Sequence, residues 1–180
     1  MNSALGFCLF ETAIGECAIG WDSHTLVAVH LPADSPEHLR KRMATRLETQ
    51  ETPPPAFVQA AIERIRRLLQ GEADDLMDLP LAMDAVPEFH RRVYEVTRAI
   101  PPGRTLTYGE VAQRIGDPGA ARAVGQALGL NPFAPVVPCH RVLAAGGRSG
   151  GFSAEGGTAT KLRMLEIERA RFGSDPGLFD

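Results

Sequence analysis

Two short helix-compatible segments joined by a tight turn constrain the fold more than any other feature of the sequence. The capping-box pattern Thr107-x-x-Glu110 predicts a helix over 108–115, which a glycine then ends. Asp117 is a suitable N-cap for a second helix over 118–128, with proline at its first position. This spacing is typical of a helix-turn-helix. It is compatible with nucleic-acid binding, but most such helix pairs bind nothing.

The N-terminal part of the chain has the pattern of a small antiparallel sheet followed by helices. Residues 7–10, 16–21 and 26–31 are apolar or alternate, which predicts two or three strands. A polar helix-compatible stretch covers 35–47, and apolar residues recur with helical period over 57–68. The spacing of leucines at 76, 79 and 81 predicts one more strand.

The C-terminal part begins at a helix start signal, Pro87, where we place a domain boundary. The pattern predicts a helix over 88–99, a strand over 136–143, a glycine-rich loop over 146–157 and a last helix over 161–172. The expected fold class is therefore α/β (α+β). A supportive sheet-plus-helix domain over 1–86 precedes a mainly helical, winged-helix-like domain over 87–172, and 173–180 form a tail.

Composition excludes several classes of protein. The chain of 180 residues is 44% hydrophobic and 23% charged, which excludes collagen-like and wholly disordered chains. No apolar run is long enough to span a bilayer, and the N-terminus lacks the basic start of a signal peptide. Three cysteines indicate reduced thiols and a cytoplasmic protein.

Charge divides unevenly between the two halves of the chain. Residues 1–87 hold 7 Lys/Arg and 13 Asp/Glu, whereas 88–172 hold 12 and 7. The basic second half is compatible with an anionic partner such as nucleic acid, and equally with chance variation of the surface.

The adjacent pair Cys139-His140 is the candidate for nucleophilic chemistry. A thiol attacks as a thiolate, and a nearby base makes that form accessible. Neighbouring residues of an extended chain point to opposite faces, so the pair can cooperate only if the chain bends there. Pro138 and the following glycine loop permit a bend. The alternative is an inert buried cysteine beside a histidine with a structural role.

The remaining cysteines do not suggest a metal site. Cys8 and Cys17 lie in predicted strands, and neither forms a CxxC or HxxxH pattern with His24 or His30. We therefore expect both to be buried as small apolar residues, and no metal to be bound. Arg122 lies among small residues on the second predicted helix. It suits either a helix entering a DNA groove or an ordinary solvated surface.

Taken together, these segments resemble the O6-alkylguanine-DNA alkyltransferases, also called methylated-DNA–protein-cysteine methyltransferases. Pro138-Cys139-His140-Arg141-Val142 resembles their active-site signature. Further matches in order and spacing are Gly103-x-x-x-Thr107-Tyr108, Ala121-Arg122-Ala123-Val124-Gly125, Asn131-Pro132, the glycine loop, and Lys161 with Glu168. The match covers about residues 87–170 and is weaker over 1–86.

The resemblance implies suicide repair of O6-alkylguanine in double-stranded DNA after base flipping. Cys139 would accept the alkyl group, His140 would act as base through a water, and Glu168 would orient it. Tyr108 and Lys161 would assist protonation of the leaving guanine, and Arg122 would fill the space of the flipped base. DNA contacts are further implied for Thr107, Tyr108, Ala121, Ala123 and Gly125, and pocket or structural roles for Asn131, Arg141, Phe152 and Ser153.

The resemblance also implies no metal or organic cofactor, no membrane partner and a monomer. The loop over 151–160 departs from a common family form, since it is two residues longer and has Phe152 where tyrosine is frequent. Three other functions remain compatible with the residues: a lesion binder without transfer activity, a helix-turn-helix regulator with a redox-sensing Cys139, and a thiol hydrolase. The intact Cys139 argues against the first.

Overall fold

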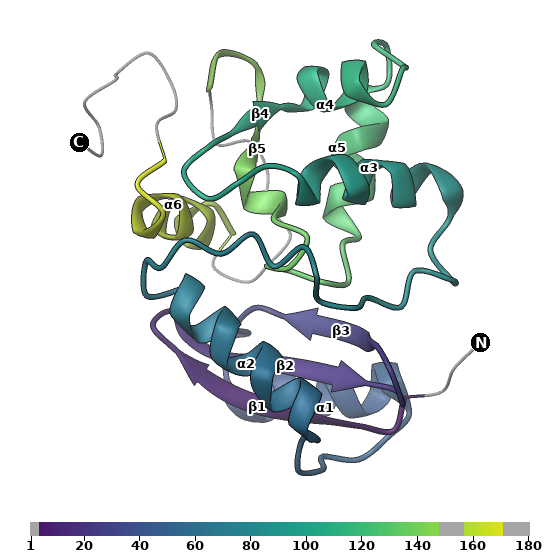
Figure 1. Cartoon of the computed structure of the whole chain (residues 1–180), viewed down its shortest axis with the longest axis vertical. Coiled ribbons are helices and arrows are strands. Elements are labelled where there is room, and N and C mark those ends of the chain that lie inside the picture. The colour runs from purple at the N-terminus through teal and green to yellow at the C-terminus, as the bar shows by residue number, and fades with distance from the viewer. Residues whose placement is uncertain (1–3, 148–156, 171–180) are drawn as a thin grey trace.

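The computed structural model describes residues 4–147 and 157–170 of the chain. Two parts lie one above the other along the long axis (Figure 1): a three-stranded sheet with two helices, and a mainly helical part with a two-stranded sheet. This mixed α/β architecture confirms the predicted fold class.

The N-terminal sheet has the strands that the sequence predicts. β1 (Gly6–Thr12), β2 (Gly15–Trp21) and β3 (Leu26–His30) form an antiparallel sheet in the order β1-β2-β3. The turn between β1 and β2 places Gly15 at a φ of 122°, a conformation that side chains disfavour. The Thr12 hydroxyl donates to the Gly15 carbonyl oxygen at 2.7 Å and closes that turn.

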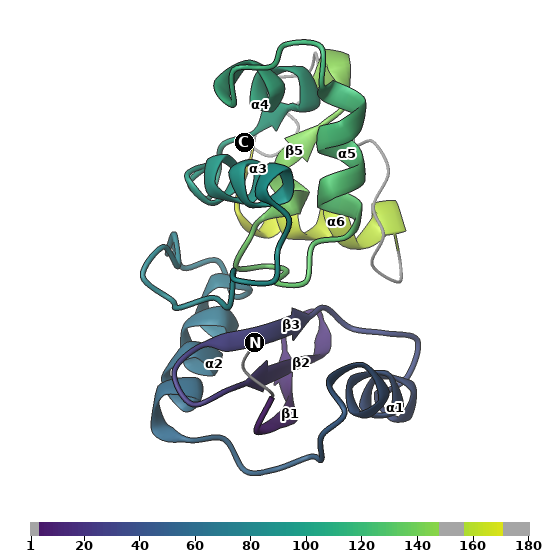
Figure 2. The ribbon, with the colours of Figure 1, turned by 90° about the vertical axis from the view of Figure 1, so that its right-hand side faces the viewer.

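Two helices cover opposite faces of this sheet (Figure 2). α1 (Pro36–Leu47) begins at Ser35, whose Oγ accepts a hydrogen bond from the His38 amide at 3.1 Å. α2 (Ala56–Leu68) buries its apolar stripe against the other face, where the largest core cluster of the protein includes Trp21 and Ile65. Both faces of the sheet are thereby removed from water.

The C-terminal part is built around a helix pair. Its elements are α3 (Glu88–Arg98), β4 (Leu106–Thr107), α4 (Tyr108–Arg114), α5 (Ala121–Gly129), the short 3-10 helices η1 (Cys139–Arg141) and η2 (Ala145–Gly147), β5 (Val142–Leu143), and α6 (Gly157–Ile167). β4 and β5 pair in parallel through Leu106 and Val142. The predicted capping box is confirmed, because Thr107 and Glu110 exchange hydrogen bonds of 3.0 Å at the start of α4.

Four of the elements predicted from the sequence differ in the structure. The second helix of the pair begins at Ala121, not at Pro118, because residues 117–120 form a turn closed by Ala120 N–H to the Asp117 carbonyl. No strand forms over 76–81, where only Leu81 makes an isolated bridge to Leu26. The strand expected over 136–143 shrinks to two residues after a 3-10 turn. The last helix, expected over 161–172, spans Gly157–Ile167, so it begins four residues and ends five residues earlier than expected.

The two parts are joined by backbone hydrogen bonds and a shared core. In β3, the Leu26 amide donates to the Pro80 carbonyl at 2.8 Å, and the Val29 amide to the Pro132 carbonyl at 2.9 Å. Val136 and Met164 of the C-terminal part belong to the core cluster of the N-terminal sheet. β3 therefore fixes the segment that leads to Cys139. Within residues 4–147 and 157–170, no helix has the length and hydrophobicity needed to cross a membrane.

A buried hydrogen bond ties α3 to α5. The Tyr94 side chain is 1% exposed, and its hydroxyl donates to the Ala127 carbonyl at 2.7 Å. We expect Tyr94→Phe to lower the free energy of unfolding by about 1 kcal/mol. Urea unfolding measures this, with Tyr108→Phe as the control, since Tyr108 is only partly buried. Equal midpoints for wild type and Tyr94→Phe would contradict the role of this bond.

Candidate active site around Cys139

A tight turn places Cys139 and His140 where both side chains can serve one site. Pro138 has φ −82° and ψ 68°, and the Cys139 amide donates to the Val137 carbonyl at 2.8 Å. These values describe an inverse γ-turn at Pro138. The 3-10 turn η1 follows directly, with the Arg141 amide donating to the Pro138 carbonyl at 2.9 Å. The bend on which cooperation of the pair depends is therefore present.

The Cys139 thiol is buried and protonated at rest. Only 7% of the residue is exposed. Burial raises the pKa of Cys139, and a hydrogen bond from Asn131 and the charge of Lys161 oppose this only in part. Asn131 is itself fixed, because its Nδ2 donates to the Val137 carbonyl at 2.8 Å and its Oδ1 accepts from the Phe133 amide at 2.9 Å. The thiol needs a base before it can attack.

A buried network of three charged or titratable side chains lies next to the thiol. His140 Nε2 and Glu168 Oε2 are 3.0 Å apart. Arg141 donates to both oxygens of the same carboxylate, from Nε at 2.9 Å and from Nη2 at 2.7 Å. Its Nη1 donates to the Ile100 carbonyl at 2.7 Å. The side chains of His140, Arg141 and Glu168 are 1%, 2% and 3% exposed.

This network sets the charge of each member. Burial alone would raise the pKa of Glu168, but His140 and Arg141 outweigh it and lower that pKa to about 2. Burial lowers the pKa of His140 despite the carboxylate beside it. The network therefore holds a carboxylate, a guanidinium and a neutral imidazole. A neutral imidazole has one donor and one acceptor nitrogen. With Nε2 donating to Glu168, Nδ1 is left as the acceptor.

Lys161 and Tyr108 supply two proton-bearing groups near the thiol. Lys161 is fully buried and its Nζ donates to the Val142 carbonyl at 2.7 Å. Burial lowers the pKa of Lys161 to about 8, while the nearby Cys139 opposes the change. Nζ lies 5.7 Å from the centre of the Tyr108 ring. Burial and Cys139 raise the pKa of Tyr108, so its hydroxyl keeps its proton at neutral pH.

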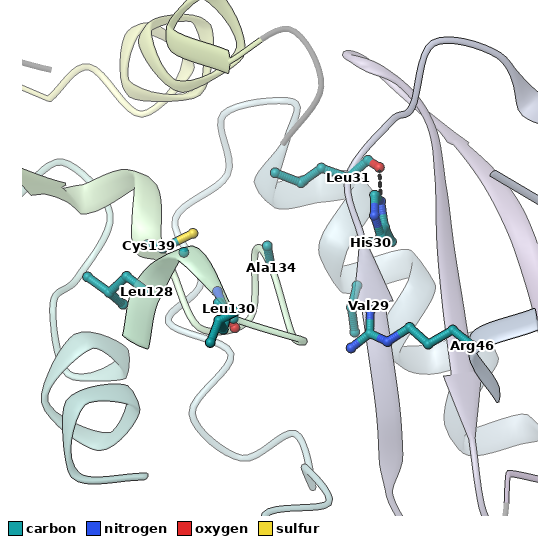
Figure 3. Close-up of a pocket in the computed structure, with 10 residues that line it drawn as sticks. Val29, His30, Leu31, Arg46, Leu128, Leu130, Ala134 and Cys139 are labelled. Atoms are coloured by element: carbon teal, nitrogen blue, oxygen red, sulfur yellow. Dashed lines mark hydrogen bonds between the residues drawn. The ribbon is translucent and has the colours of Figure 1, made fainter. Parts of the chain in front are cut away.

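Cys139 lines a cavity between the two parts of the protein (Figure 3). The cavity measures about 430 Å³, within the range of small-molecule sites. Its C-terminal wall comes from the end of α5, Asn131 and Ala134, and its opposite wall from β3 and α1. Figure 3 shows the thiol on one side, with His30 and Arg46 across the gap. The Cys139 thiol thus faces a cavity whose lining combines apolar residues with the polar side chains of His30, Arg46 and Asn131.

The helix-turn-helix carries the residues expected to meet DNA. Arg122 is exposed near the start of α5, and Ala121 and Ala123 beside it are partly buried. A Cβ on Gly125 would lie 3.8 Å from the Tyr108 ring, so the ring packs over this glycine. The Thr107 hydroxyl is already engaged as the cap of α4. A long cation therefore projects from a surface of small side chains.

The structure brings most of the predicted site residues together. Asn131, Lys161 and Tyr108 lie near the Cys139 thiol, and Glu168 holds the imidazole of the next residue, His140. Arg122 is exposed near the start of α5, on the helix-turn-helix. Phe152 and Ser153 lie outside the described residues. In the part of the chain that is described, no group of three or more His, Cys, Asp or Glu side chains is placed to hold a metal.

Sequence reasoning missed two features of this site. Arg141 binds the carboxylate that orients His140, and only its place in the motif marked it in the sequence. His30, Arg46 and Leu130 line the cavity that contains Cys139, although two of them come from the N-terminal part. Contacts between segments this far apart leave no local pattern in the sequence.

The buried network predicts a specific dependence of stability on pH. Because the pKa of Glu168 lies below its ordinary 4.5, its contribution is complete above pH 4.5 and is lost as pH falls toward about 2. Because the pKa of His140 is also lowered, the protein loses further stability as pH falls below 6.5. We expect Glu168→Gln to lower the free energy of unfolding at neutral pH by roughly 3–5 kcal/mol, because Arg141 is left buried and unpaired.

Chemical unfolding at a series of pH values measures this effect. The stability curves of wild type and Glu168→Gln should converge between pH 4.5 and about 2, since the variant has no carboxylate to protonate at this position. Curves that stay parallel over that interval would contradict the lowered pKa of Glu168.

Comparisons with known proteins agree with this geometry. The domain described as "6-O-methylguanine DNA methyltransferase, DNA binding domain" matches residues 88–170. The methylated-DNA–protein-cysteine methyltransferase of Mycobacterium bovis is 42% identical over 132 residues, which is 73% of this chain and 78% of the relative. That of Methanosarcina acetivorans is 32% identical over 162 residues, covering 90% and 97%.

Solved structures extend the likeness to the whole fold. Mycobacterium tuberculosis OGT in complex with DNA superposes with a TM-score of 0.75 at 33% identity, covering 98% of this chain and 100% of that one. The O6-methylguanine-DNA methyltransferase of Pyrococcus kodakaraensis gives a TM-score of 0.68 at 29% identity, covering 93% and 99%. Sequence, fold and the buried thiol with its histidine thus agree, and the chain belongs to the methylated-DNA–protein-cysteine methyltransferase family.

Proposed function

We propose that Cys139 accepts the alkyl group of O6-alkylguanine in double-stranded DNA, in a direct reversal of the damage. The observation that carries this proposal is the buried thiol on the wall of a cavity, beside a neutral histidine held by a carboxylate. The thiolate attacks the alkyl carbon as the bond from that carbon to O6 breaks. The electron pair of the broken bond goes to guanine. The thioether is stable, so each chain reacts once.

The buried network of His140, Arg141 and Glu168 determines where the thiol proton goes. His140 Nδ1 receives the thiol proton through a water, and the resulting imidazolium is stabilised by Glu168. Arg141 is a positioning residue, because it acts on His140 through the carboxylate that both contact. Guanine takes up a proton from the Tyr108 hydroxyl, with Lys161 close to the same ring. Overall, one alkyl group moves from guanine to Cys139, and the total number of protons on protein and guanine is unchanged.

Access to a base in a duplex requires flipping. The helix-turn-helix of α4 and α5, which with β4 and β5 is winged-helix-like, would bind the minor groove. Unstacking a base costs a few kcal/mol. Arg122, projecting from small neighbours, would fill the vacated space and offset part of this cost. The flipped base would then enter the cavity that Cys139 lines, with Asn131 holding the segment that leads to the thiol.

We propose that the protein acts as a monomer and that its two parts have different tasks. We propose a supportive domain over 1–86 and a catalytic, DNA-binding domain over 87–172. The tail over 173–180 lies outside the described residues. The free thiols of Cys8, Cys17 and Cys139 favour the cytoplasm, where thiols stay reduced.

Intact-protein mass tests the acceptor role. After mixing with a duplex containing O6-methylguanine, wild-type protein should gain a single methyl group that maps to Cys139. Cys139→Ser should gain none and should still bind the duplex, because it changes one atom in a site apart from Arg122. Cys8→Ser is the matched control and should be methylated normally. Methylation of the Cys139→Ser protein, or more than one methyl per wild-type chain, would contradict the proposal.

The role of Arg122 is tested separately. We expect Arg122→Ala to slow methyl transfer from duplex DNA on the order of tenfold, if the arginine contributes about 1.4 kcal/mol to flipping. Transfer from a single-stranded oligonucleotide should change much less, since no partner strand holds the base. Single-turnover rates measure both. Equal rates for wild type and Arg122→Ala on the duplex would exclude the finger role.

A further inference from the structure

A second cavity lies beside the end of α6, apart from the one that Cys139 lines. It measures about 420 Å³ and is lined by Gly103, Arg104, Thr105 and Arg169. The loop before β4 passes the end of α6 closely here, because a Cβ on Gly103 would lie 3.4 Å from the Glu168 carbonyl oxygen. Of the lining residues in the described part of the chain, two are arginines and none is acidic. We call these four residues the arginine cleft.

Arg169 occupies a position where glycine would be more stable. Its φ is 56°, in the left-handed region. The Arg169 amide donates to the Glu166 carbonyl at 3.0 Å, and the Ala170 amide to the Leu165 carbonyl at 2.9 Å, which closes the end of α6. Helices commonly end this way with glycine, since a side chain costs about 1–2 kcal/mol in this conformation. The stability of the fold therefore does not explain why position 169 is an arginine.

Neither arginine of the cleft is neutralised by a neighbour within residues 4–147 and 157–170. Among the residues that the structure describes, Arg104 and Arg169 form no ion pair and no side-chain hydrogen bond, and both are exposed. The buried Arg141, by contrast, has its carboxylate partner at 2.7 Å. Two guanidinium groups at one cavity repel each other unless an anion lies between them. Their planar donor pairs match the oxygens of a phosphate.

We propose that the arginine cleft binds a phosphate group, with the Thr105 hydroxyl as a further donor. The favoured source is the DNA backbone. Thr105, Leu106 and Thr107 lead directly to Tyr108, and extended residues advance about 3.3 Å each, so Arg104 lies within roughly 13 Å of Tyr108. A duplex over the helix-turn-helix can therefore extend to the cleft. Binding of a DNA phosphate rests on the DNA binding proposed above, whereas binding of free phosphate does not depend on it.

The experiment compares variants by binding to an undamaged duplex at several salt concentrations. The variants are Arg104→Gln, Arg169→Gly and the control Arg67→Gln, an exposed arginine of α2. Arg169→Gly should fold at least as stably as wild type, because glycine suits the left-handed position. Each cleft variant should weaken binding severalfold at low salt. It should also reduce the slope of log K against log salt by about 0.9 for each phosphate that the variant no longer neutralises.

A second measurement identifies the source. Arginine Nε–H resonances of the wild-type protein are followed by NMR during titration with inorganic phosphate. Reduced salt slopes for both cleft variants, with Arg67→Gln unchanged, support a DNA phosphate. Unchanged slopes together with saturable shifts at Arg104 and Arg169 support a free phosphate. Unchanged slopes without such shifts, or equal losses in Arg67→Gln, would overturn the proposal. Methyl transfer to Cys139 is measured on the same variants, so a failure of the proposed function is seen separately.

Discussion

The bidentate contact between Arg141 and Glu168 is the interaction on which the site depends. It joins η1 to the residue that follows α6, and the third donor of Arg141 extends the connection to Ile100, just after α3. A buried ion pair stabilises little by itself, because desolvation offsets most of its attraction. Its value here is geometric: both carboxylate oxygens are fixed, and one of them holds His140.

The same contact and the burial of the site together set the charges of these side chains. The carboxylate stays ionised at every physiological pH, since its pKa is lowered to about 2. Burial keeps His140 neutral and Cys139 protonated, so the nucleophile is held as a thiol at rest. A thiol that reacts only once is best kept protonated until a substrate fills the cavity. In the proposed reaction, deprotonation would then occur next to the alkyl carbon and not in open water.

Local patterns in the sequence predict those parts of the fold that local interactions determine. The capping box at Thr107 and the alternation in the three N-terminal strands both appear in the structure. The proline at 118 was a wrong start signal, because residues 117–120 turn before α5 begins at Ala121. The leucines near 79 fill the core under the sheet without forming a strand. Tertiary packing outweighs local propensity at such positions.

The site was predictable only where its residues share a motif. Cys139 and His140 stand together in the sequence, but whether they cooperate depends on the γ-turn at Pro138, which apolar periodicity does not reveal. The wall formed by His30 and Arg46 depends on how β3 packs beside the segment leading to Cys139. The resemblance implied Glu168 as the partner of His140, whereas the contribution of Arg141 follows from the distances alone.

Two properties of His140 are central: burial keeps the imidazole neutral, and Glu168 fixes its proton on Nε2. Nitrogen-15 NMR of the histidine ring at neutral pH tests this most directly. We expect one protonated nitrogen, Nε2, and an unprotonated Nδ1. An imidazolium signal at neutral pH, or a proton on Nδ1, would contradict the account, because His140 would then have no free acceptor for the thiol proton.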